Sequence, residues 1–409
     1  MSHSTTAGDA AGIESPYAWT RLWISLLIAT IGGVGMWSVV VVLPAVQAEF
    51  GVARGGASIP YTATMMGFAA GSVFMGRLAD RFGVVVPILL GGVMLCVGYV
   101  GAALSSSLWL FIVFQGIGIG FLGCSVVFGP LVADVSHWFD RRRGMAVGIC
   151  ASGNYLSGTV WPPIIQNLVE VIGWRHTYMA IGVVCLVTML PLALLLRRPS
   201  PRGHGASTGA GGTLGKLPVS AGTLQTMLII AGITCCLAMA MPQVHIVAYC
   251  GDLGYGVARG AEMLALMLGC GVVSRLASGW ICDRIGGVRT LLLGSALQCL
   301  TLFFYLPFDG LMSLYVVSAL FGLAQGGIVP SYAIIVREHL PAEEAGTRVG
   351  LVLMSTIVGM AAGGWLSGAI FDLTGSYQAA FINGIAWNLV NVGIALWLLS
   401  MRPRRLAIA

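Results

Sequence analysis

Apolar segments of about 20 residues recur along this chain, and they constrain its fold more than any other feature of the sequence. A helix of that length crosses the roughly 30 Å hydrocarbon layer of a bilayer. Only 9% of the 409 residues are Asp, Glu, Lys or Arg, too few to cover the surface of a soluble protein of this size. Ten-residue segments of alternating polarity, typical of outer-membrane barrels, do not occur. The sequence therefore predicts an all-α polytopic membrane protein.

Turn and charge signals divide these segments into twelve predicted transmembrane helices, in two groups of six. The predicted helices cover residues 22–43, 57–75, 84–104, 108–134, 143–168, 176–196, 222–251, 258–281, 288–306, 310–336, 346–370 and 378–400. Residues 197–221 are rich in Pro, Gly and Ser and are predicted to form a flexible cytoplasmic linker. We therefore expect one six-helix bundle over 22–196, a second over 222–400, and short tails at 1–21 and 401–409.

The positions of the cationic side chains predict how the chain lies in the membrane. Of 21 Lys and Arg residues, seventeen fall on the side that holds both termini, and three, Arg54, Arg175 and Arg259, fall on the opposite side. Because Lys and Arg concentrate in cytoplasmic loops, both termini are predicted to be cytoplasmic, in a cell (inner) membrane. The net charge of +6 is attributed to topology and lipid contact, and no nucleic-acid partner is expected.

The two halves of the chain repeat a loop motif. GRLADRFG at 76–83 matches GWICDRIG at 279–286, at an offset of 203 residues, about half the chain. Parallel repeats of this kind build six-plus-six secondary transporters. The first copy resembles the loop signature of the major facilitator superfamily, and this resemblance implies two bundles, a central cavity between them and alternating access. It also implies a gating role for the motif residues Gly76, Asp80, Arg81, Gly83, Asp283 and Arg284.

Arg275 is the one charged residue well inside a predicted helix. It comes eight residues before Asp283, about 12 Å from that end of the helix. An ionisable side chain at such depth is costly and marks a ligand site or pathway. A salt bridge to an acid on another helix is the alternative, but few acids lie at a matching depth. Because an unpaired guanidinium is a two-pronged donor suited to a carboxylate, Arg275 is predicted to bind an anionic substrate.

The seventh predicted helix carries a second polar group. His245, Tyr249 and Asp252 lie at i, i+4 and i+7, so they share one helix face. Pro242, just before them, is expected to break the helix locally, as in other transporter sites. Hydrogen-bonded packing is the alternative role for His245, but a side chain that changes charge near neutral pH also suits proton coupling. His245 and Tyr249 are predicted to contact the substrate, and His245 or Asp252 to carry a proton.

These residues, in the contexts HIVAYCGDLG and SRLASG, resemble the monocarboxylate-transporter branch of the superfamily, especially its bacterial members. The resemblance implies that the arginine of helix 8 pairs with the substrate carboxylate and that uptake is coupled to a proton. Mammalian members place an aspartate one turn before that arginine, where this chain has Gly271. Their acidic motif before the glycines of the first helix is also missing. His245 and Asp252 therefore stay as the candidate proton sites.

Further polar residues in the predicted helices are candidates for the cavity lining, although hydrogen bonding between helices explains each of them equally well. They are Tyr61, Gln115, Asn154, Tyr155, Gln243, Tyr332 and Ser355. The resemblance implies that a dicarboxylate exchanger would need a second cation, often from helix 11. No Lys or Arg occurs in residues 349–370. The single cation, Arg275, therefore favours a substrate with one carboxylate.

The sequence thus predicts a secondary transporter and not an enzyme, namely a proton-coupled symporter of small monocarboxylates such as lactate or pyruvate. No cofactor and no metal are expected. The expected partners are the monocarboxylate, a proton and the lipid bilayer, and the protein is expected to act as a monomer. One alternative is an exchanger or symporter of another organic anion, such as a dicarboxylate or an aromatic acid, on the same fold. The other is a transporter-like sensor that binds without translocating.

Overall fold

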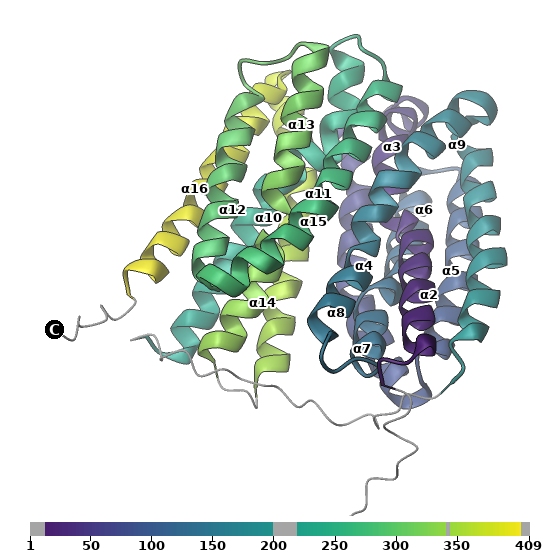
Figure 1. Cartoon of the computed structure of the whole chain (residues 1–409). Helices are drawn as coiled ribbons and strands as arrows, with labels where there is room; N and C mark the ends of the chain where they lie inside the picture. The colour runs from purple at the N-terminus through teal and green to yellow at the C-terminus, as the bar shows by residue number, and fades with distance from the viewer. Residues whose placement is uncertain (1–12, 199–218, 341–343, 402–409) are drawn as a thin grey trace, which may run out of the picture.

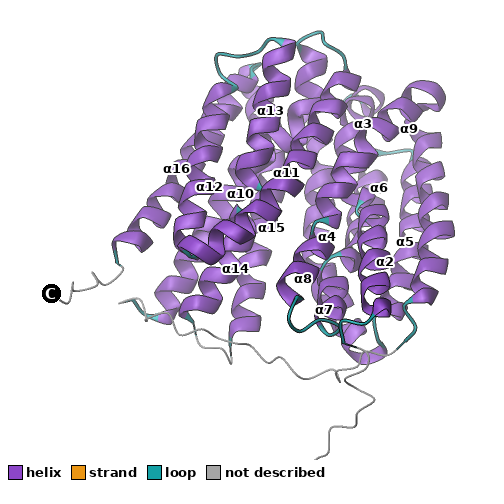
Figure 2. Ribbon diagram, in the orientation of Figure 1, coloured by secondary structure: helices purple, strands orange, loops and turns teal. Residues whose placement is uncertain are grey.

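The chain folds into long helices that run side by side (Figure 1). The computed structural model describes residues 13–198, 219–340 and 344–401, and these ranges contain no β-strand (Figure 2). The first half contains α2 (Pro16–Gly32), α3 (Val34–Phe50), α4 (Arg54–Phe82), α5 (Val85–Ala103), α6 (Leu108–Val113), the π-helix η1 (Phe114–Gly123), the 3₁₀-helix η2 (Cys124–Val127), α7 (Gly129–Ser136), α8 (Arg143–Ala151) and α9 (Gly153–Leu195). The second half contains α10 (Ala221–Asp252), α11 (Val257–Ile285), α12 (Gly287–Phe304), α13 (Leu311–Gln325), α14 (Ile328–His339), α15 (Ala345–Thr374) and α16 (Tyr377–Ser400).

Ten helical segments in these ranges are long and apolar enough to cross a membrane. One of them, Arg143–Leu195, contains two predicted spans, and Gly173 separates them with a φ of 76° that favours glycine. Helix α4 is 29 residues long but rich in Gly, Ser and Thr, so it is not among the ten. With these two observations the structure agrees with the predicted twelve-helix fold. Residues 199–218 of the predicted linker, and most of both predicted tails, lie outside the described residues.

The internal repeat is visible in the backbone. Helices α4 and α11 differ by the same 203 positions at both ends. Each ends at a motif glycine with positive φ, Gly83 at 79° and Gly286 at 84°, whose N–H donates to a carbonyl in the last turn. A residue with a Cβ is strained in this conformation. The repeated glycines therefore serve to end two equivalent helices.

The two halves meet near the face of the bundle opposite the described chain ends, which we call the distal face; the face that holds residues 13 and 401 is the terminal face (Figure 1). There α4 packs against α15, and the Thr62 hydroxyl donates to the Ala361 carbonyl at 2.9 Å. Toward the terminal face the space beside Gly76, Gly279 and Gly346 is open, since a Cβ added there meets no atom within 4 Å. The ribbons of the two halves lie closer together at the distal face than at the terminal face (Figure 1).

Glycine also allows close helix packing within each half, and Gly322 shows how closely. A Cβ at Gly322 in α13 would overlap the Met267 carbonyl oxygen of α11. We expect Gly322→Ala to destabilise the protein by about 1–3 kcal/mol, because backbone atoms cannot move aside as a flexible side chain would. Thermal unfolding in detergent measures the effect. Gly393→Ala in α16, where a Cβ meets no atom within 4 Å, is the matched control; equal unfolding temperatures would contradict the expectation.

Candidate functional site

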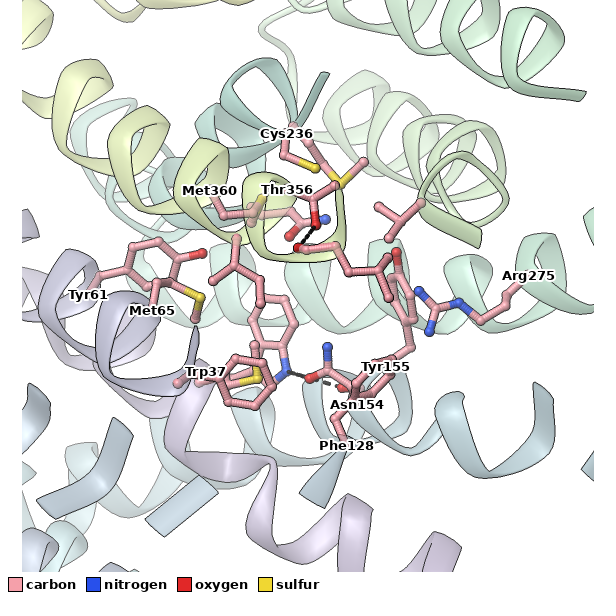
Figure 3. Close-up of a pocket in the computed structure, with 17 residues that line it drawn as sticks. Trp37, Tyr61, Met65, Phe128, Asn154, Tyr155, Cys236, Arg275, Thr356 and Met360 are labelled. Carbon is pink, nitrogen blue, oxygen red and sulfur yellow. Dashed lines mark hydrogen bonds between the residues drawn. The ribbon is translucent and has the colours of Figure 1, made fainter. Parts of the chain in front are cut away.

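A cavity of about 140 Å³ lies between the two halves (Figure 3). Helices α3, α4 and α9 line it from the first half, and α10, α11, α14 and α15 from the second. Most of its wall is apolar and comes from aromatic and methionine side chains. The lining residues are Met36, Trp37, Tyr61, Met65, Phe68, Phe128, Asn154, Tyr155, Cys236, Met239, Gln243, Arg275, Val329, Leu353, Thr356, Ile357 and Met360.

Arg275 reaches this cavity from α11 (Figure 3). Its guanidinium carbon lies 4.2 Å from the centre of the Tyr155 ring, and Nη1 donates to the Ala151 carbonyl at 2.9 Å. The longer Nε contact goes to the Gly326 carbonyl at 3.4 Å. No carboxylate within the described ranges forms an ion pair with Arg275. Arg275 thus lines the cavity with ring and carbonyl contacts and without a carboxylate partner among the described residues.

Four other predicted residues line the cavity beside Arg275: Tyr61, Asn154, Tyr155 and Gln243. Asn154 accepts hydrogen bonds from the Trp37 indole at its backbone carbonyl, 3.1 Å, and at its side-chain oxygen, 3.3 Å. Tyr155 stacks under Arg275. The Tyr61 hydroxyl is buried and has no hydrogen-bond partner among the described residues.

Three predicted residues lie outside this cavity, and their partners explain why. The Gln115 amide donates to the Tyr178 hydroxyl at 2.8 Å, inside the first half. The Tyr332 hydroxyl has two acceptors for its hydrogen inside the second half, the Ala231 carbonyl at 3.0 Å and the Asn391 side-chain oxygen at 2.8 Å. The Ser355 hydroxyl donates to a carbonyl of its own helix. Each is a buried polar group satisfied by packing, and none of the three lines this cavity in this conformation.

His245 and Tyr249 are also absent from the cavity lining. His245 is fully buried, with Nε2 2.8 Å from the Gly364 carbonyl and Nδ1 3.3 Å from the Tyr377 hydroxyl. The Tyr249 ring packs edge-on against Tyr377, with centroids 5.3 Å apart. The shared helix face is therefore real, but it faces α16 near the distal face. In this conformation neither side chain is placed to touch a substrate in the cavity.

Asp252 belongs to the same distal group, where Arg54 of the first half joins it. The Arg54 guanidinium forms an ion pair with Asp252 at 3.1 Å and donates to the Tyr377 hydroxyl at 2.9 Å. The Asp372 carboxylate accepts from the backbone N–H of Arg54, 2.8 Å. We call Arg54, His245, Asp252, Asp372 and Tyr377 the distal cluster. It connects α4 of the first half to α10, α15 and α16 of the second.

The prediction that Pro242 breaks its helix is wrong. Helix α10 continues from Ala221 to Asp252 with Pro242 inside it. The proline removes one backbone donor, but α10 packs against both α15 and α16 along its length, and this packing keeps the helix intact. The polar group that follows Pro242 is therefore held by a continuous helix.

The repeated loop motifs lie on the terminal face. Asp80 and Asp283 are exposed there, and no ion pair within the described ranges includes either carboxylate. Arg81 lies over the Phe82 ring at 5.2 Å, and Arg284 over the Trp280 ring at 3.8 Å. Within the described ranges, these carboxylates thus form no ion pair that would hold the terminal face closed in this conformation. A gating role for these residues stays a prediction.

Sequence reasoning missed Arg54, Asp372 and Tyr377. Arg54 was assigned to an external connection, and Asp372 and Tyr377 lie at helix ends where polar residues are unremarkable. One signal was present in the sequence: Arg54 is one of only three Lys and Arg residues predicted on the side opposite the termini. A cation that departs from the positive-inside pattern is a candidate for a specific partner.

Comparison with known proteins agrees with this geometry. The family model for the Major Facilitator Superfamily matches residues 25–347 and 264–408. Monocarboxylate transporter 13 from Bos taurus is 28% identical over 80% of this chain and 76% of its own. The MFS-type transporter pynF from Aspergillus niger is 26% identical over 76% of this chain and 71% of its own. These relatives confirm the predicted resemblance to monocarboxylate transporters.

The fold has a similar solved structure. It is a bacterial homologue of the human lysosomal transporter Spinster, in an inward-facing and occupied conformation, with a TM-score of 0.75 and 14% identity over 95% of this chain and 98% of that one. This likeness concerns the fold alone. It shows that the arrangement of helices is that of a known membrane transporter.

Proposed function

This chain belongs to the major facilitator superfamily, a family of membrane transporters and not enzymes, and we propose that it is a proton-coupled symporter of small monocarboxylates. The observation that carries the proposal is Arg275, a cation in the central cavity whose ring and carbonyl contacts leave its charge without a carboxylate partner among the described residues. A substrate carboxylate supplies that partner, and the charge-assisted hydrogen bonds offset the cost of keeping a guanidinium inside the bilayer.

His245 is the proposed proton carrier. The Gly364 carbonyl can only accept a hydrogen bond, so Nε2 carries a hydrogen and Nδ1 is the atom that a proton enters. Arg54 donates to the Tyr377 hydroxyl, which then directs its own hydrogen at Nδ1. If the distal face opens, α4 carries Arg54 away, and the hydroxyl can turn to accept from a protonated Nδ1. Proton uptake is thereby linked to opening, while Asp252 holds Arg54 when the face is closed.

In this proposal the terminal face is cytoplasmic and the distal face is external, in the cell membrane. The charge asymmetry of the sequence supports this orientation, because seventeen of the 21 Lys and Arg residues fall in the tails and in connections predicted on the same side as the termini. The structure then corresponds to an inward-facing state. The proposal includes a monomer as the working unit, since the cavity and the distal cluster are both built within one chain.

Lactate uptake into proteoliposomes tests the coupling. We expect accumulation to follow a pH gradient and to ignore the membrane potential, because one proton and one monocarboxylate together carry no net charge. A gradient of one pH unit then supports about tenfold accumulation. His245→Gln should abolish this accumulation while it still allows exchange of internal for external lactate.

Two controls define the outcome. A protonophore should collapse accumulation in the unmodified protein, and an imposed potassium diffusion potential should leave it unchanged. Accumulation driven by the potential, or by internal counter-anion alone, would contradict proton symport. Full pH-driven accumulation by His245→Gln would remove His245 from the proton path but leave the transport of monocarboxylates intact.

A further inference from the structure

Tyr61 presents an unpaired hydroxyl to the cavity, from the side opposite Arg275. Its side chain is 1% exposed, and its hydroxyl has no hydrogen-bond partner among the described residues. Figure 3 shows Tyr61 and Arg275 on opposite sides of the cavity, Tyr61 with its hydroxyl toward the middle and Arg275 with its guanidinium against the Tyr155 ring. Buried polar groups are nearly always hydrogen-bonded. An unpaired hydroxyl that faces a ligand cavity therefore indicates a ligand group that completes it.

Most of the wall between these two polar ends is apolar. Trp37, Phe128, Met65 and Met360 contribute much of it (Figure 3). Aromatic rings and methionine sulfur pack well against another aromatic ring. The cavity of about 140 Å³ has room for roughly ten water-sized groups, more than the six non-hydrogen atoms of lactate. The cavity thus fits a molecule with a flat apolar body between two polar ends.

We propose that the preferred substrates are amphipathic monocarboxylates that carry a hydroxyl, carbonyl or amide group at the end remote from the carboxylate. Arg275 binds the carboxylate, the aromatic and methionine wall holds an aryl body, and Tyr61 hydrogen-bonds the remote group. A hydroxyl both donates and accepts, so it pairs with any of these three groups. This inference rests on the proposed monocarboxylate transport and adds recognition of the other end of the substrate.

Uptake of a matched pair of acids tests it. In proteoliposomes with a pH gradient, we expect 3-(4-hydroxyphenyl)propanoate to be taken up with about tenfold higher kcat/KM than 3-phenylpropanoate, as one added neutral hydrogen bond predicts. Tyr61→Phe should remove this preference, so that the two acids are taken up with similar kcat/KM. The variant should unfold at the same temperature as the unmodified protein or higher, since it loses a hydroxyl that makes no bond in the empty cavity.

Tyr332→Phe is the matched control, because its hydroxyl is bonded inside the second half and lies away from the cavity. It should lower the unfolding temperature and keep the preference between the two acids. Equal uptake of the two acids by the unmodified protein, or an equal loss of both in Tyr61→Phe, would overturn the role of Tyr61. Uptake of lactate without either aryl acid would overturn the substrate class but not the proposed function. Failure to take up any monocarboxylate would overturn both.

Discussion

Replacement of Arg275 by alanine is expected to lower lactate uptake by about 100-fold or more. Arg275 is the one cation among the residues that line the cavity, and it contacts the Tyr155 ring and the Ala151 carbonyl but no carboxylate of the described residues. Removing one partner of a buried, hydrogen-bonded charge pair typically costs about 2–5 kcal/mol. Initial rates of labelled lactate uptake under a fixed pH gradient measure the loss. Arg275→Lys should retain part of the activity, since it keeps the charge but not the planar fork.

Arg259→Gln is the matched control for Arg275. Arg259 lies on the same helix, α11, but at its distal end, where it is exposed and pairs with Glu262. We expect its replacement to leave uptake unchanged. Because Arg275 also bonds to carbonyl groups of both halves, the unfolding temperature of each variant separates a failure to fold from a failure to bind. A folded Arg275→Ala protein with unchanged uptake would contradict the assigned role.

The fold could be predicted from the sequence because its determinants are local. Runs of apolar residues fix the spans, and the glycines of the repeated motif, Gly83 and Gly286, fix where α4 and α11 end. The effect of Pro242 could not be predicted locally, since the neighbours of α10 decide whether a proline breaks it. The division of the fourth predicted helix into α6, η1, η2 and α7 likewise depends on close packing against α4 and α5.

The candidate site was predictable where a residue violates the chemistry of its surroundings. Arg275 stands out in an apolar helix, and the structure places it in the cavity. Gln115 and Tyr332 show the limit, because a polar residue satisfied by a neighbouring helix looks the same in the sequence as one that faces a cavity. The distal cluster could not be predicted from the sequence, because it depends on pairs such as Arg54 and Asp372, which are far apart in the chain and close in space.

The distal cluster has a direct consequence for the conformation of the protein. Arg54 is 7% exposed and joins the halves through Asp252, 3.1 Å, and Tyr377, 2.9 Å. Because the Asp252 side chain is 38% exposed, breaking this ion pair costs less than the roughly 3–5 kcal/mol of a fully buried pair. Removing Arg54 therefore destabilises only the conformation with a closed distal face, since these contacts cross between the halves and disappear when the face opens. Arg54 therefore biases the equilibrium toward the conformation described above.

We expect Arg54→Ala to increase labelling of Cys236 from the distal side by about tenfold or more. Cys236 lines the cavity and is 1% exposed in this conformation, so a reagent that cannot cross the membrane reaches it only after the distal face opens. The labelling rate in whole cells, which expose the distal face in the proposed orientation, measures the change. The same variant with Cys236→Ser identifies labelling of other cysteines.

Arg175→Ala provides the matched control for this effect. Arg175 also forms an ion pair near the distal face, with Glu49 at 2.6 Å, but both residues belong to the first half. Its loss removes a similar charge pair without releasing a contact between the halves, so labelling of Cys236 should stay at the level of the unmodified protein. Equal labelling of the Arg54 and Arg175 variants would show that surface charge, and not the connection between the halves, controls access. A higher rate in Arg54→Ala alone assigns the closed state to the distal cluster. Of the two ion pairs compared, Arg54–Asp252 joins α4 to α10, whereas Arg175–Glu49 lies within the first half.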